Sequence, residues 1–155
     1  MITAWRLIKA KYAAHAFDGE GARLYGGRWN SPGSPISYCS ATASLAVLEV
    51  FANVQRTDLL AEYVLIACSF DESLVTRVEA GGLPANWRQS PAPPELAAIG
   101  DAWIRDGVSA VLDVPSAIID RERNYLINPM HTDFKRIKRR PAEPFKFDLR
   151  LIERT

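Results

Sequence analysis

Short apolar runs, each bounded by glycine, proline or polar clusters, mark where the chain is expected to form β-strands. The run Tyr63–Phe70 is continuously apolar, and Ile36–Cys39 is short and β-prone, as in a buried strand. Five further runs are also predicted to form strands: Ile2–Leu7, Leu74–Val78, Val108–Val114 (which ends at Pro115), Tyr125–Ile127 and Phe145–Ile152.

Two segments predict helices. In SATASLAVLEVFANV, Ser40 or Thr42 can cap a helix that runs from about Ser44 to Val54. Because this segment is apolar on nearly all sides, we expect a buried helix. The second predicted helix spans Pro94 to Asp106, since proline suits the first helical turn.

The intervening segments are rich in residues that favour turns. Residues 18–35 contain five glycines and two prolines, and residues 80–94 contain four prolines, which predicts loops and tight turns. Strands and helices do not alternate strictly, so the pattern indicates an α+β fold rather than a doubly wound sheet. The length of 155 residues fits one domain, over residues 1–155.

Composition excludes some classes of protein. The chain is 48% hydrophobic and 24% charged, which is ordinary for a globular protein. The net charge of +1 provides no strong field to attract nucleic acid or a membrane. A core of this size needs neither disulfides nor metals.

Cys39 and Cys68 both lie in apolar runs and are interpreted as buried, inert thiols. The sequence contains no CxxC motif or Cys/His cluster, so we expect no metal site. It also shows no signal-length apolar region at its start and no apolar run near the ~20 residues of a membrane span. We therefore expect a cytoplasmic protein that does not enter a membrane.

The candidate chemistry lies between residues 26 and 55, where only Arg28 and Glu49 are charged. Average composition would give roughly seven charged residues there. A lone carboxylate in a buried helix costs several kcal/mol unless it is paired or hydrogen-bonded. The two residues therefore either form a structural ion pair or face a cleft.

The residues around Arg28 favour a ligand site. Gly26 and Gly27 precede it and let the backbone approach a ligand closely, and arginine can bind phosphate through two hydrogen bonds. Tyr38 lies between Arg28 and Glu49 in sequence. Its ring either packs in the core or stacks on a ligand base.

Two ordered blocks resemble the signature of RES-domain proteins. Residues 21–51 read GARLYGGRWNSPGSPISYCSATASLAVLEVF, and residues 113–134 read DVPSAIIDRERNYLINPMHTDF. The characteristic Arg, Glu and Ser of the family match Arg28, Glu49 and Ser116, with Arg23 as a second arginine. The sequence departs from the family pattern at Thr132, where a proline commonly follows the histidine.

The resemblance implies a fold like that of ADP-ribosyltransferase toxins, with two packed β-sheets flanked by helices. It implies a toxin of a two-gene toxin–antitoxin system that cleaves NAD at the nicotinamide–ribose bond. NAD is then the substrate, no metal is needed, and ADP-ribose passes to water, phosphate or a protein target. The implied partner is an antitoxin with a helix-turn-helix (Xre-like) part and a C-terminal part that covers the cleft.

The resemblance also implies residue roles. Glu49 would stabilise the oxocarbenium-like transition state and orient the nucleophile. Tyr38 would stack on the nicotinamide, and Arg28 would hold the pyrophosphate or a ribose. We therefore predict Glu49, Tyr38 and Arg28 as catalytic residues, and as NAD-binding residues Arg23, Gly27, Arg28, Asn30, Tyr38 and Ser116. Ser116 is equally compatible with a turn or helix cap after Pro115.

Two alternatives remain open at this point. An RNA-acting toxin would use the basic run of residues 135–140 to bind phosphates, although that run lacks interleaved aromatic residues and also fits a solvated strand or a contact with an acidic antitoxin face. A non-catalytic binding module would use Arg28 and Glu49 as an ion pair only. His131 is interpreted as a capping or packed residue.

Overall fold

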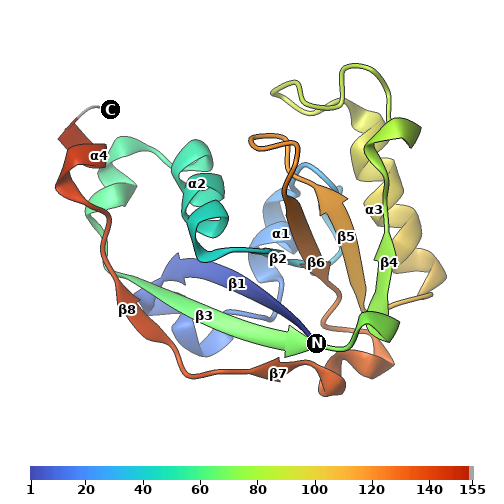
Figure 1. The fold of residues 1–155 in the computed structure, drawn as a ribbon, viewed down its shortest axis with the longest axis horizontal. Coiled ribbons are helices and arrows are strands. Elements are labelled where there is room, and N and C mark those ends of the chain that lie inside the picture. Colours follow the sequence, from blue (N-terminus) through green and yellow to red (C-terminus); the bar gives the residue numbers. More distant parts are fainter. Residues whose placement is uncertain (154–155) are drawn as a thin grey trace.

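The computed structural model describes residues 1–153. Across these residues the strands form one sheet in the order β4-β5-β6-β2-β1-β3-β7, and β8 also pairs with β3 (Figure 1). The strands are β1 (Ile2–Lys9), β2 (Ser37–Ser40), β3 (Tyr63–Phe70), β4 (Val75–Arg77), β5 (Val111–Pro115), β6 (Arg123–Ile127), β7 (Lys138–Arg139) and β8 (Glu143–Phe145). The α-helices are α1 (Glu20–Tyr25), α2 (Ala43–Asn53), α3 (Pro94–Asp106) and α4 (Leu149–Glu153).

The sheet bends sharply where β1 meets β2. β1 pairs with β3 along its whole length, and β2 pairs with β6 from Ser37 to Ser40. Between β1 and β2, however, the paired register consists of Trp5 opposite Ser40 alone. The mixed α/β single domain is confirmed, and the two expected sheets are the two halves of this one curled sheet (Figure 1).

Helix α2 begins where the sequence predicted. Thr42 caps it, because its Oγ1 accepts a hydrogen bond from the Leu45 amide at 3.1 Å. The expectation that this helix is buried on nearly all sides is wrong. Leu45 and Ala46 alone are fully buried, while Leu48 is 40% exposed. The helix packs on β1 by one face, where Val47 and Phe51 join the cluster around Leu7 and Tyr63. Val50 and Ala52 border an open cleft.

Helix α3 covers the outer face of the β4–β6 half of the sheet (Figure 1). It buries Leu96 and Trp103 together with Leu112, Val114 and Trp29. Gly100 lets α3 lie directly against the backbone of Trp29, since a Cβ at this position would lie 1.7 Å from the Trp29 carbonyl oxygen. This contact fixes the backbone segment that carries Arg28 against α3.

Two local predictions are wrong. The segment 18–35 was expected to lack regular structure, yet it contains α1, whose ends are set by Gly19 (φ 71°) and Gly26 (φ 72°). The predicted strand Phe145–Ile152 is instead the end of β8 followed by α4. Phe147 turns into the core against Tyr63, with ring centroids 5.1 Å apart, and Asp148 then accepts the Arg150 amide to start α4.

No helix within residues 1–153 is long and apolar enough to cross a bilayer.

Candidate functional site

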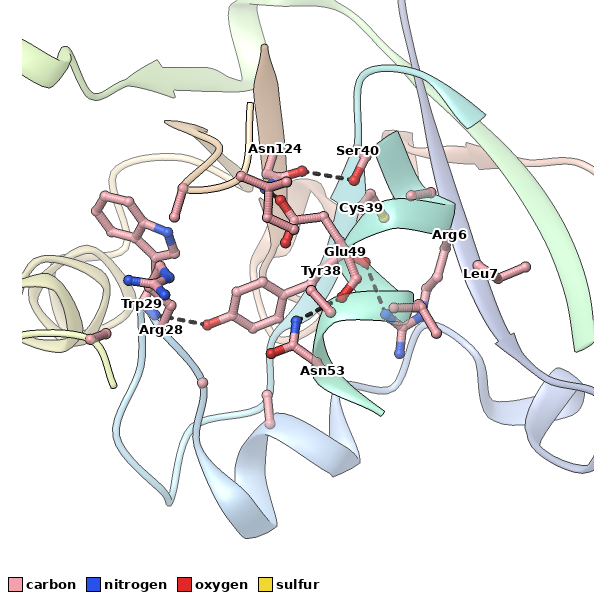
Figure 2. Close-up of a pocket in the computed structure, with 18 of the residues that line it drawn as sticks. Arg6, Leu7, Arg28, Trp29, Tyr38, Cys39, Ser40, Glu49, Asn53 and Asn124 are labelled. Atoms are coloured by element: carbon pink, nitrogen blue, oxygen red, sulfur yellow. Dashed lines mark hydrogen bonds between the residues drawn. The ribbon is translucent and has the colours of Figure 1, made fainter. Parts of the chain in front are cut away.

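A cleft of about 850 Å³ opens beside the bend of the sheet. Its walls come from β1, β2, α2, the segment after α1, and the loops that contain Arg88 and Ala117. Figure 2 shows Tyr38 near the middle of this cleft, with Arg28 on one side and Arg6 on the other. The cleft is therefore built from segments that lie far apart in the sequence.

Glu49 reaches the cleft from α2 and is held by two neutral donors. Its Oε1 accepts a hydrogen bond from Ser116 Oγ at 2.8 Å and another from Asn124 Nδ2 at 2.7 Å. Its second oxygen, Oε2, makes no hydrogen bond to any residue of the described chain. The carboxylate is thus fixed in position without a cation to neutralise it.

Arg28 does not form the structural ion pair considered above. Its Nη1 donates to the carbonyl oxygens of Trp87 (3.2 Å) and Gln89 (2.8 Å). Burial lowers its pKa, and the charge of Glu49 acts in the opposite direction. The Nε and Nη2 donors have no partner within residues 1–153, so the guanidinium is anchored at one nitrogen and open at the others.

Tyr38 is held by its hydroxyl. The OH donates to Asn30 Oδ1 at 2.6 Å and accepts from the Trp29 amide at 3.2 Å. Burial raises the pKa of Tyr38 far above its ordinary value, so the phenol stays neutral. A Cβ at Gly27 would lie 2.8 Å from this oxygen, which explains why a glycine stands there.

The structure divides the predicted residues into three groups. Gly27, Arg28, Tyr38 and Glu49 line the cleft. Asn30 and Ser116 lie behind it, 2% and 0% exposed, where they hold Tyr38 and Glu49 respectively. Arg23 does not line the cleft and instead pairs with Glu20 on the surface of α1.

The sequence interpretation missed several cleft residues. Asn124 binds Glu49, and Asn53 Nδ2 donates to the Glu49 backbone oxygen at 2.7 Å. Arg88 connects its own loop to the loop that contains Ala117, because it donates hydrogen bonds to the carbonyl oxygens of Ala117 and Ile118. Both loops line the cleft. Asn124 falls inside the second signature block and Arg6 inside the predicted strand Ile2–Leu7. Only their three-dimensional neighbours distinguish them from surrounding polar residues.

His131 is a capping residue, as interpreted from the sequence. Its Nδ1 accepts from the Asp133 amide at 3.0 Å, which leaves Nε2–H to donate to the Gly107 carbonyl oxygen at 2.9 Å. The basic run of residues 135–140 forms the end of a short 3-10 helix and β7. None of its residues lines the cleft.

Residues 1–153 contain no group of three or more His, Cys, Asp or Glu side chains arranged to hold a metal ion.

Comparison with known proteins identifies relatives along nearly the whole chain. Residues 3–148 match the family model described as RES domain. A protein from Photorhabdus laumondii named Toxin Res is 38% identical over 151 residues, 96% of each chain. A Sphingobium protein named Prs ADP-ribosylating toxin is 33% identical and covers 97% of this chain and 96% of its own.

The fold also matches a solved structure. A chain of the M. tuberculosis MbcT–MbcA toxin–antitoxin complex superposes with a TM-score of 0.80 at 22% identity. The match covers 99% of this chain and 87% of that one.

Proposed function

The chain belongs to the RES domain family, and from this premise we propose that it is the toxin of a toxin–antitoxin pair and cleaves the nicotinamide–ribose bond of NAD. Relatives named Toxin Res and Prs ADP-ribosylating toxin support this assignment. The observation that carries it is the Glu49 carboxylate, anchored through Oε1 by Ser116 and Asn124 in an open cleft.

This arrangement of Glu49 suits cleavage of an N-glycosidic bond. Loss of nicotinamide leaves positive charge on the ribose C1 and its ring oxygen, as in glycoside hydrolysis. A carboxylate already fixed in place stabilises that charge without reorganising as the charge develops. Both hydrogen-bond donors of Glu49 are neutral, so no cation among its hydrogen-bond partners offsets the carboxylate. Oε2 remains available to orient the acceptor.

Arg28 and Tyr38 supply binding. The open Nε and Nη2 edge of Arg28 is shaped for two parallel hydrogen bonds to a phosphate oxyanion, as in a nucleotide pyrophosphate. The Tyr38 ring, fixed by its hydroxyl, offers an aromatic surface for the nicotinamide. Asn30 and Ser116 then act by holding Tyr38 and Glu49, rather than by touching the ribose.

The acceptor of ADP-ribose is water, phosphate or a protein side chain. Any of these attacks C1 of the ribose as the bond to nicotinamide breaks. We propose that an antitoxin with a helix-turn-helix part covers the cleft and blocks NAD. The MbcT–MbcA complex, which has a chain of the same fold, is consistent with such a partner.

The proposal is tested by measuring nicotinamide release from NAD by the purified, antitoxin-free chain. Water, phosphate and cell lysate are offered in turn as acceptors. We expect release from the wild type and a near-complete loss in Glu49→Gln, which keeps the size of the side chain but removes its charge. Glu143→Gln, an exposed carboxylate on β8, is the matched control and retains full activity.

Circular dichroism and thermal melting establish that each variant is folded. The acceptor that release depends on separates hydrolysis, phosphorolysis and protein modification. Full activity in folded Glu49→Gln, or no release by the folded wild type with any acceptor, would reject the proposed reaction. RNA cleavage without NAD loss would point instead to the basic run of residues 135–140.

A further inference from the structure

Arg88 holds two neighbouring peptide groups of the turn that follows β5. Its Nε donates to the Ala117 carbonyl oxygen at 3.0 Å, and its Nη2 donates to the Ile118 carbonyl oxygen at 3.1 Å. The third nitrogen, Nη1, donates to Asp120 Oδ2 at 3.3 Å. The guanidinium therefore binds the two carbonyls side by side, in the forked arrangement that arginine uses for paired oxygens.

Ser116 binds the opposite ends of the same two peptide groups. The Ala117 carbonyl shares one peptide group with the Ile118 amide, and the Ile118 carbonyl shares the next with the Ile119 amide. Both amides donate to Ser116 Oγ, each at 3.1 Å. Because the C=O and N–H of a trans peptide group point in opposite directions, a donor on one side and an acceptor on the other fix its plane. Arg88 is that donor, and the Ser116 hydroxyl oxygen is that acceptor.

The chain of hydrogen bonds continues from Ser116 to Glu49, whose Oε1 accepts the serine hydroxyl proton at 2.8 Å. A cation at one end of such a chain polarises the bonds that follow it. Arg88 thereby makes the two amides stronger donors to Ser116. Since these amides occupy the lone pairs of the hydroxyl oxygen, its one proton is left for Glu49. The connection from Arg88 to Glu49 therefore runs through backbone and serine.

The ion pair with Asp120 does not account for this arrangement. Both side chains of the pair are about half exposed, and water screens an ion pair between exposed groups so that it contributes little. The two carbonyl contacts of Arg88, by contrast, lead to Ser116, which is 0% exposed. The forked contact is therefore the part of the Arg88 environment that reaches the site.

The backbone on either side of Arg88 offers a second route into the cleft. The carbonyl oxygens of Trp87 and Gln89 both accept from Arg28 Nη1. Movement of this segment would displace Arg28 and change substrate binding. Movement of the turn that carries Ser116 would displace Glu49 and change the rate of bond cleavage. Binding and cleavage are separated by KM and kcat, so the two routes are distinguishable.

We propose that Arg88 is a positioning residue for the reaction, which acts on Glu49 through the peptide groups of residues 117–119 and Ser116. This inference rests on the proposed function, in which the fixed carboxylate of Glu49 stabilises positive charge on the ribose. It requires no contact between Arg88 and the reacting atoms. Loss of Arg88 loosens the carboxylate and leaves the substrate-binding groups in place.

The first test measures steady-state nicotinamide release from NAD. We expect Arg88→Gln to lower kcat about 3- to 10-fold and to leave KM within about twofold. Arg105→Gln removes the same charge from the exposed end of α3 and should change neither value. Asp120→Asn removes the ion pair but keeps both carbonyl contacts, so kcat should fall by at most about twofold. Circular dichroism and thermal melting establish that each variant is folded.

A double-mutant cycle then tests the route through Ser116. In the Ser116→Ala background the connection to Glu49 is already broken. Arg88→Gln should therefore lower kcat by less than about twofold in that background. If Arg88 only braces the rim of the cleft, the same substitution lowers kcat by an equal factor in both backgrounds.

Amide hydrogen exchange, followed by NMR, tests the connection without relying on activity. We expect the amides of Ile118 and Ile119 to exchange about 3- to 10-fold faster in Arg88→Gln, because the turn opens more often once its carbonyls lose their donor. The amides of β3, which is remote from the turn in the sheet, should keep their exchange rates.

Equal kcat losses in the two backgrounds would overturn the proposal. A raised KM at constant kcat would do so as well, because it would place the effect at Arg28, and so would unchanged exchange at Ile118 and Ile119. If the folded wild type releases no nicotinamide, the proposed reaction fails. The exchange rates then still decide whether Arg88 holds the turn that positions Glu49.

Discussion

Ser116 and Glu49 are 67 residues apart in the chain, and the Ser116 hydroxyl donates to Glu49 Oε1 at 2.8 Å. The same hydroxyl oxygen accepts the amides of Ile118 and Ile119, each at 3.1 Å. Because these two donors occupy its lone pairs, the one hydroxyl proton is directed at Glu49. A tight turn after β5 therefore sets the position of the carboxylate on α2.

Replacing Ser116 with Ala should slow catalysis without removing the substrate-binding groups. The fully buried Ser116 site would lose one bond to Glu49 and leave two amides unpaired, which costs about 1 to 3 kcal/mol of folding stability. We expect kcat for nicotinamide release to fall about tenfold or more with a small change in KM. A raised KM at constant kcat would instead place Ser116 against the substrate.

Asn124 provides the second anchor of Glu49, through Nδ2 at 2.7 Å. Asn124→Leu keeps the volume but removes this donor and the acceptor of Ser40 Oγ. We expect kcat to fall about 10- to 100-fold, since the carboxylate loses a charge-assisted bond. Ser40→Ala breaks the Ser40–Asn124 contact alone, so its kcat should fall much less. Equal losses in the two variants would argue that Asn124 acts through Ser40.

Gly27→Ala should damage the Tyr38 side of the cleft. The new Cβ would lie 2.8 Å from the Tyr38 hydroxyl oxygen and 3.0 Å from Asn30 Oδ1, so the ring must shift. We expect a rise in KM for NAD of about tenfold, equivalent to the loss of one good contact. Gly21→Ala on α1 meets nothing within 4 Å and serves as the control. Steady-state kinetics measure KM for NAD in both variants. A KM in Gly27→Ala equal to that in Gly21→Ala would contradict this account.

Tyr38 predicts a specific pH dependence of stability. Its folded-state pKa is raised by burial above the ordinary 10.0, so its contribution to folding is complete below pH 10 and is lost as the pH rises further. Tyr38→Phe should cost about 1 to 3 kcal/mol at neutral pH, because Asn30 and the Trp29 amide lose a partner. Urea unfolding between pH 8 and pH 11 should show the two proteins converging in stability. A constant difference across this range would refute the assignment.

The buried ion pair between Arg123 and Asp113 should be important for the β4–β6 half of the sheet. Arg123 Nε lies 2.5 Å from Asp113 Oδ1, and Arg123 also binds the Val78 carbonyl oxygen. Arg123→Gln would leave a carboxylate that is 7% exposed with only a 3.5 Å contact to Arg77. We expect a loss of about 3 to 5 kcal/mol in the free energy of unfolding, measured with urea. Arg121→Gln, on the exposed hairpin, should change it by less than about 0.5 kcal/mol.

Much of the fold was predictable wherever residues specify their structure locally. The runs at β1, β3, β5 and β6 are apolar enough to indicate strands, and Pro94 and Thr42 mark the starts of α3 and α2. The short elements were missed or misassigned because their sequences carry weak local signals. β7 and β8 are strands because they pair with β3, and α4 forms where Phe147 packs on Tyr63 and Asp148 turns the chain.

The site divides in the same way. The sequence by itself singled out Arg28, Tyr38 and Glu49, because isolated charges in an apolar stretch and a Gly-Gly pair are local features that the chain displays directly. Only the tertiary structure decided that Asn30 and Ser116 lie behind the cleft, that Arg23 faces solvent, and that Asn124 and Arg6 belong to the site. Hydrogen bonds such as Ser116–Glu49 depend on how the curled sheet brings distant segments together, and that closure has no signature in any one segment.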